Sequence, residues 1–153
     1  MNKNIIIENT RILFPNFSGI EREFNPAGRR NFNVVLPHDV AEQMGADGFN
    51  VRYLKPRDDG EEPTPILKVN VSFDRTPPKI LMINSFNQVY LNSDTVSILD
   101  TADIINVDLV IRPYNYGAKL GRPGMSAYLQ SLYVTIQDDP FEAKYTRREE
   151  IPF

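Results

Sequence analysis

The longest strand candidate in the chain reads IINVDLVIRPYNY over residues 104–116. Its side chains alternate, because successive residues of a β-strand point to opposite faces. Val107, Leu109 and Ile111 share one face and predict a buried side. Asp108, Val110, Arg112, Tyr114 and Tyr116 share the other. The stretch therefore predicts one long strand with a single apolar face.

Further strand candidates lie on both sides of this stretch. Residues 5–14 form a first strand with a bulge expected near Asn9, and the other candidates are residues 31–36, 49–54, 66–73, 79–83, 89–91 and 128–136. Helix-start signals predict two short helices, over 37–44 and 93–99. We therefore expect a mainly β, OB-fold-type five-stranded Greek-key barrel with extra hairpins and two short helices, since closure protects strand edges. A β-sandwich remains the alternative.

Composition excludes several classes of protein. The chain has 153 residues, no Cys and one His, so thiol nucleophiles, thiolate metal sites and multi-His zinc sites are excluded. No apolar run approaches the ~20 residues of a membrane span, and the N-terminus lacks signal-peptide features. We expect a cytoplasmic protein without membrane contact, cofactor or metal.

The formal net charge of -3 does not by itself exclude a nucleic-acid partner. Phosphates respond to local clusters of cations rather than to the average charge. One cluster combines Arg112, Tyr114 and Tyr116 with Lys119 and Arg122 of the glycine-containing loop 117–124. Rings can stack on bases and cations can bind phosphates. The alternatives are tyrosines that close a barrel and a solvated hairpin loop.

A second basic and aromatic cluster consists of Arg52, Tyr53, Lys55 and Arg57, and Lys68 on the polar face of the next strand extends it. Cations on a solvated face are the alternative interpretation. The nearby acidic loop, residues 58–62, raises the weaker alternative of a nuclease, but it lacks the spacing of a calcium-binding loop.

The last residues, Glu149, Glu150, Ile151, Pro152 and Phe153, combine acids, a proline and an aromatic ring. This ending resembles the acidic tails of bacterial single-stranded-DNA-binding proteins, which end in Asp-Asp-Ile-Pro-Phe and dock on replication and repair enzymes. The last three residues match; Arg147 and Arg148 beside the acids depart from the family pattern. The resemblance implies a tail over 141–153 that recruits replication or recombination proteins, following a domain over 1–140.

The body of the chain carries a longer resemblance. The segments NTRILF (9–14), NFSG (16–19), FNP (24–26), RNF (30–32), VDLVIRPY (107–114) and AYL (127–129) are similar to phage-encoded single-stranded-DNA-binding proteins. The resemblance implies an OB-fold that coats single-stranded DNA in phage replication, recombination or repair, adds Tyr128 to the DNA-binding candidates, and implies no enzymatic activity. Whether several copies assemble is left open. The alternative function is a β-rich structural or assembly protein of a virion.

Overall fold

The computed structural model describes residues 3–22, 25–74, 76–121 and 124–138. Its strands are β1 (Ile5–Thr10), β2 (Ile12–Asn16), β3 (Arg30–Val35), β4 (Arg52–Leu54), β5 (Thr64–Val71), β6 (Lys79–Ile83), β7 (Gln88–Leu91), β8 (Ile104–Asn115) and β9 (Met125–Ile136). Its helical elements are α1 (His38–Ala46), the 3-10 helix η1 (Val96–Asp100) and α2 (Gly117–Leu120). The protein is mainly β, as expected.

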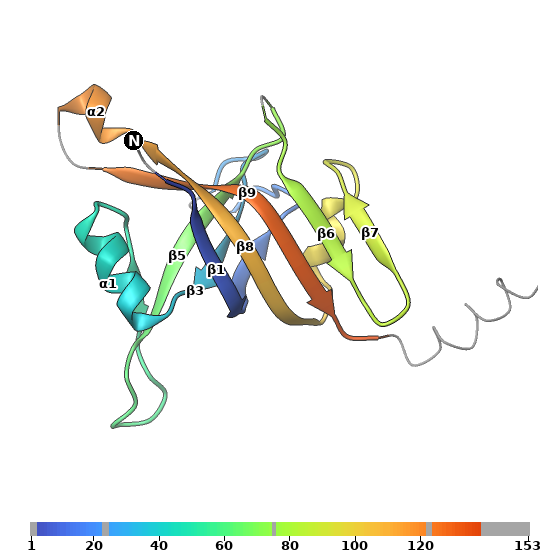
Figure 1. The fold of residues 1–153 in the computed structure, drawn as a ribbon, viewed down its shortest axis with the longest axis horizontal. Coiled ribbons are helices and arrows are strands. Elements are labelled where there is room, and N and C mark those ends of the chain that lie inside the picture. Colours follow the sequence, from blue (N-terminus) through green and yellow to red (C-terminus); the bar gives the residue numbers. More distant parts are fainter. Residues whose placement is uncertain (1–2, 23–24, 75, 122–123, 139–153) are drawn as a thin grey trace, which may run out of the picture.

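The main strand path runs β1-β8-β9-β5-β3-β2 (Figure 1). Its two end strands, β1 and β2, are separated in sequence only by Arg11. Neighbours on the path are antiparallel except β5 and β9, which are parallel. β4 is added beside β5, and the β6–β7 hairpin is added beside β9. The described residues form nine strands, which differs from the five expected for the barrel alone, since the first strand is split in two and three strands are additions.

The split between β1 and β2 has a local cause. Asn9 has a positive φ of 52°, and the pairing of β1 with β8 shifts between Ile7 and Thr10. Asn tolerates this left-handed conformation better than most residues. The Asn9 amide also donates a hydrogen bond to the Asp108 carboxylate at 2.8 Å. The bulge expected near Asn9 is confirmed, and it lets one continuous segment turn from β8 toward β3.

The core lies on one face of the sheet. Val107, Leu109 and Ile111 of β8 are at most 1% exposed, as the alternation in residues 104–116 predicts. Phe17 and Phe32 stack in this core with ring centroids 5.1 Å apart. The opposite face of β3, β5, β8 and β9 is left to carry polar and aromatic side chains.

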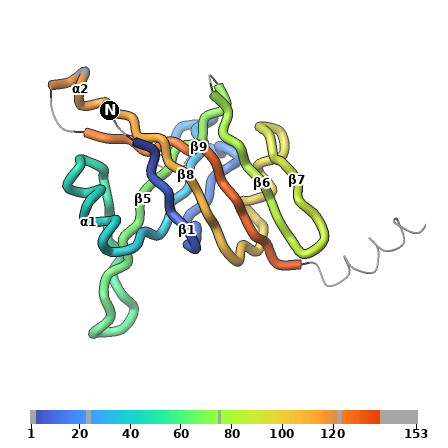
Figure 2. The backbone as a smooth tube through the Cα atoms, viewed as in Figure 1, coloured from blue at the N-terminus to red at the C-terminus, as the bar shows by residue number. Residues whose placement is uncertain are grey.

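The helical segments match the predictions unevenly. α1 forms where Pro37 predicted it, whereas residues 96–100 form a 3-10 helix and residues 117–120 form a short helix in a segment expected to be a loop. The strand expected over 49–54 is confined to β4. The tube in Figure 2 shows α1 and α2 at the same end of the sheet, away from the β6–β7 hairpin. Within the described ranges, no helix is both long and apolar enough to cross a membrane.

Candidate nucleic-acid interface

A groove of about 750 Å³ lies on the polar face of the sheet. It crosses strands β2, β3, β5 and β9 and is bordered by the described residues 17–22 and 25–29 of the loop between β2 and β3 (the 17–29 loop) and by Tyr116, which leads into α2. Its lining residues are Phe14, Asn16, Arg22, Asn25, Arg29, Asn31, Asn33, Asn50, Arg52, Leu67, Lys68, Asn70, Tyr116, Met125, Ser126, Ala127 and Tyr128.

Strand register places a row of polar side chains across the groove. The partners in sequence are Asn16 with Asn31, Asn31 with Asn70, Asn70 with Tyr128, and Tyr128 with Arg112. These pairs cross five strands, from β2 to β8. Because directly opposed residues in a sheet share a face, the row forms one continuous strip of amides, a phenol and a guanidinium.

Three asparagines of the groove hold the 17–29 loop in place. Asn16 donates to the Ile20 carbonyl at 3.0 Å and accepts from the Ile20 amide at 3.1 Å. Asn31 donates to the Asn25 side-chain oxygen at 2.7 Å, and Asn25 donates to the Arg29 carbonyl at 2.9 Å. Asn16 and Asn31 are only 3% and 8% exposed, and burial of polar groups in a sheet requires such partners. Asn16 of β2 and Asn31 of β3 therefore hold the 17–29 loop through their side chains.

A second set of contacts fixes the start of the same loop. The Asp100 carboxylate accepts hydrogen bonds from the Phe17 amide at 2.6 Å and the Ser18 amide at 3.0 Å. The Arg30 guanidinium donates to the Phe17 carbonyl at 3.1 Å and lies over the Phe73 ring, 5.1 Å from its centroid. Asp100 lies in η1 and Arg30 lies in β3, so both charge-assisted sets of hydrogen bonds reach the loop from outside it. The loop is therefore tied down from both sides.

The charges that line the groove are all positive. Arg22 and Arg29 come from the 17–29 loop, Arg52 from β4 and Lys68 from β5, and no acidic residue is among the described lining residues. Arg52 donates to the Asn33 side-chain oxygen at 2.9 Å, and both residues line the groove. A low net charge for the whole chain is compatible with this local concentration of cations.

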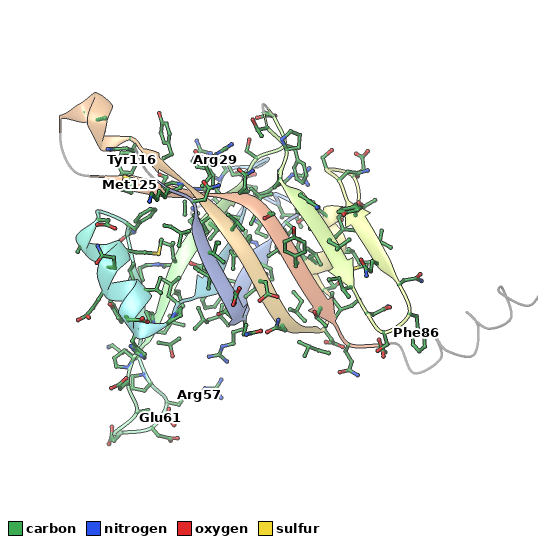
Figure 3. All side chains as sticks on the ribbon, in the orientation of Figure 1. Arg29, Arg57, Glu61, Phe86, Tyr116 and Met125 are labelled. Carbon is green, nitrogen blue, oxygen red and sulfur yellow. The ribbon has the colours of Figure 1, made fainter. Side chains whose placement is uncertain are left out.

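Aromatic rings stand at the β8–β9 end of the groove. The Tyr128 ring makes an edge contact with Tyr114, with centroids 6.2 Å apart and planes at 88°, and the Arg112 guanidinium carbon lies 5.9 Å from its centroid. Tyr116 precedes α2, and its ring lies on Gly124: a Cβ added there would be 2.4 Å from the ring carbon Cε2. Figure 3 shows Tyr116, Met125 and Arg29 close together in this view. Glycine at position 124 is thus required for the observed place of the Tyr116 ring.

Phe14 is the aromatic residue at the opposite border of the groove. It is 61% exposed and has a φ of 52°, at a point where the pairing of β2 with β3 shifts between Leu13 and Asn16. A left-handed conformation is rare for an aromatic residue, and Pro15 further favours extended backbone at position 14. Strained backbone that presents an exposed apolar ring to a groove is typical of functional positions.

The sequence comparison with protein families identifies the chain. The family model described as "Putative phage ssDNA-binding domain" matches residues 1–153. The chain belongs to this family. No curated protein matches it.

Solved structures of the single-stranded DNA-binding protein from bacteriophage Enc34 share the fold of this family member. The structure of that protein by itself is 17% identical, with a TM-score of 0.55, and the match covers 90% of this chain and 83% of that one. The structure in complex with ssDNA is 16% identical, with a TM-score of 0.56 and coverage of 90% and 89%. A C-terminal truncation is 16% identical, with a TM-score of 0.54 and coverage of 90% and 87%.

The DNA-binding candidates from the sequence separate into three groups. Arg52, Lys68, Tyr116 and Tyr128 line the groove, and Arg112 and Tyr114 contact the Tyr128 ring beside it. Tyr53, Lys55 and Arg57 are exposed but do not line the groove, and Figure 3 shows Arg57 beside Glu61, far from Tyr116. The third group lies outside the part of the chain that the structure describes. It contains the Lys119 side chain, Arg122 and the partner-binding candidates Glu149, Glu150, Ile151, Pro152 and Phe153.

Sequence reasoning missed Phe14, Arg22, Arg29 and the asparagines. Pro15 within a strand was the available signal for a bulge near Phe14, since proline in a sheet is confined to edges and bulges. The acidic loop 58–62 brings no metal cluster together: in the described ranges, no three His, Asp or Glu side chains converge.

Proposed function

We propose that this protein binds single-stranded DNA in the groove between the 17–29 loop and the segment leading into α2. The observation that carries the proposal is the combination of four cations and three rings in one groove without an acidic residue among its described lining residues. The cations Arg22, Arg29, Arg52 and Lys68 would bind phosphates. The rings of Phe14, Tyr116 and Tyr128 would stack on bases, which any base permits because each has a π-face.

The strand topology supports the finer assignment to the OB-fold. With β1 and β2 taken as one bent strand, the order β1/β2, β3, β5, β9, β8 would return to β1, as a five-stranded barrel requires, with β4 and the β6–β7 hairpin as additions. OB-folds bind oligonucleotides on the face of their second and third strands and on the loops between strands 1 and 2 and strands 4 and 5. In this chain those parts are β3, β5, the loop between β2 and β3 and the segment between β8 and β9; the groove is lined by residues of β3 and β5, by Arg22, Asn25 and Arg29 of the first loop and by Tyr116 of the second segment.

A similar protein that holds DNA supports the same function. One solved structure of the Enc34 protein is a complex with ssDNA, and this chain shares its fold. We propose a role in phage DNA replication, recombination or repair in the host cytoplasm, by binding and without catalysis. Partner recruitment by Glu149 to Phe153, and the division into a domain over 1–140 and a tail over 141–153, stay predictions.

Titration of a fluorescently labelled oligonucleotide at two salt concentrations tests the proposal. Tight, non-cleaving binding that weakens with salt is expected, because phosphate neutralisation releases counterions. Absence of binding would favour the virion structural protein, and cleavage of the oligonucleotide would favour the nuclease.

A matched pair of variants locates the interface. Arg52→Met removes a cation from the groove, whereas Arg57→Met removes one from the exposed loop outside it. The slope of log K against log salt should fall by about 0.7 for Arg52→Met, the value for one phosphate contact of a single strand. It should not change for Arg57→Met. Equal effects of both variants would place the DNA outside the groove.

A further inference from the structure

In the part of the protein that the structure describes, three asparagine side chains in the groove each use only one of their two polar atoms in a hydrogen bond. The other polar atom of each amide has no partner there. Asn31 uses its Nδ2 on Asn25 at 2.7 Å, and Asn70 uses its Nδ2 on the Ala127 carbonyl at 3.2 Å. Asn33 instead uses its Oδ1, which accepts from Arg52 at 2.9 Å. Among the described residues, Asn31 Oδ1, Asn70 Oδ1 and Asn33 Nδ2 have no hydrogen-bond partner.

These unpaired atoms open onto the groove. Asn31 is 8% exposed and Asn33 is 6% exposed, so most of each residue is buried. Yet no buried side-chain nitrogen or oxygen of the described residues lacks a partner. The small accessible part of each residue therefore includes its unpaired amide atom. Since both residues line the groove, that atom is available to a molecule bound there.

The two free oxygens belong to residues that oppose each other directly. Asn31 of β3 and Asn70 of β5 are register partners, and such side chains have Cβ atoms about 5 Å apart. Their amide nitrogens are engaged by different partners, that of Asn31 by the Asn25 side chain and that of Asn70 by the Ala127 carbonyl of β9. With both nitrogens engaged, each residue offers its oxygen to the groove. Two neighbouring acceptors call for a donor between them, and a primary amino group supplies two N–H bonds.

We propose that Asn31 and Asn70 form a receptor for the exocyclic amino group of a base, so that the groove prefers cytosine to uracil or thymine. This inference rests on the proposed function. Cytosine carries an N4 amino donor at the position where thymine carries an O4 acceptor. A carbonyl oxygen placed between two amide oxygens is repelled by both. The preference is superimposed on sequence-tolerant stacking and phosphate binding, and it is therefore modest.

Competition between homopolymers of equal length tests the inference. Oligonucleotides of about 20 nucleotides, longer than a single OB-fold site, are compared as oligo-dC, oligo-dU and oligo-dT at slightly alkaline pH. Cytosine and uracil differ at C4 and N3 but not in the methyl group, so stacking is closely matched. Wild-type protein should bind oligo-dC about 5- to 10-fold more tightly than oligo-dU, the lower range for one hydrogen-bonded base contact.

Two variants on the same face of β5 separate base recognition from phosphate binding. Asn70→Ala removes one acceptor and should bring the dC/dU ratio close to one, while thermal unfolding reports whether the fold is intact. Lys68→Ala, which removes a groove cation, should weaken binding to both oligonucleotides equally and leave the ratio unchanged.

The outcomes distinguish the inference from the function on which it rests. Tight binding with a dC/dU ratio near one, or a ratio that Asn70→Ala leaves unchanged in a folded protein, would overturn the amino-group receptor and leave the proposed function standing. Failure of wild-type protein to bind any of the three oligonucleotides would overturn both.

Discussion

Replacement of Phe14 tests whether backbone strain holds a stacking ring in the groove. Its φ of 52° lies in the left-handed region, which costs a non-glycine residue about 1 to 2 kcal/mol. At an ordinary strand position, glycine is about 0.5 to 1 kcal/mol less stable than alanine. At position 14 the order should be reversed, because alanine keeps the strain and glycine relieves it. Phe14→Gly should be more stable than Phe14→Ala by about 1 kcal/mol.

Both variants also remove the ring. Phe14 is 61% exposed, so about two fifths of its surface is covered. With about 200 Å² for the residue and about 25 cal/mol per Å², the lost burial costs at most about 2 kcal/mol of folding stability. DNA affinity should fall by about 1 to 3 kcal/mol, or roughly 5- to 150-fold, which is the contribution of one stacked base.

Thermal or denaturant unfolding measures the first effect, and fluorescence anisotropy with a labelled oligonucleotide measures the second. Phe14→Tyr, which keeps a ring, is the control and should bind within about threefold of wild type, well inside the contribution of one stacked base. Wild-type affinity in both Phe14→Ala and Phe14→Gly would refute the stacking role. A Phe14→Ala protein more stable than Phe14→Gly would refute the reasoning about strain.

Three further predictions address the rest of the molecule. Gly124→Ala should displace the Tyr116 ring and weaken DNA binding several-fold, within the ~1 to 3 kcal/mol of one stacking contact. The control Gly45→Ala, where an added Cβ meets nothing within 4 Å, should not change the affinity, and fluorescence anisotropy measures both variants. Asp100→Asn should lower unfolding free energy by about 1 to 2 kcal/mol, because the Phe17 and Ser18 amides lose a charged acceptor; denaturant titration measures this. Deletion of residues 151–153 should leave the thermal midpoint unchanged and abolish capture of a replication or recombination protein in a pull-down assay, and a large loss of stability would contradict the recruiting role.

Sequence patterns predicted the parts of this fold that local rules control. Alternation in residues 104–116 identified Val107, Leu109 and Ile111 as core, and a polar residue between apolar runs indicated the bulge near Asn9. These features depend on side-chain period and on residue preferences that act over a few positions. Local rules also placed α1.

The groove could not be predicted in the same way, because strand register assembles it. Asn16, Asn31 and Asn70 are unfavourable strand residues when considered one at a time, and only pairing across β2, β3 and β5 brings them together. The cations Lys55 and Arg57 appear equivalent to Arg52 in the sequence, but the chain leaves the sheet after β4 and takes them away from the groove. The positive φ of Phe14 opposes the preference that Pro15 imposes.

The pairing of β1 with β8 has a consequence for how the chain is made. Asn9 and Asp108, which are joined by a hydrogen bond, are 99 residues apart in sequence. A ribosome releases β1 long before its partner exists, and β8 itself pairs with β9, which is made later still. Non-local pairing of this kind slows folding. Until β8 emerges, Ile5, Ile6 and Ile7 form an unpaired apolar segment, a type of sequence prone to intermolecular β-pairing. Nascent chains that end before β8 therefore cannot complete the sheet, and they leave the N-terminal isoleucines without their partner strand.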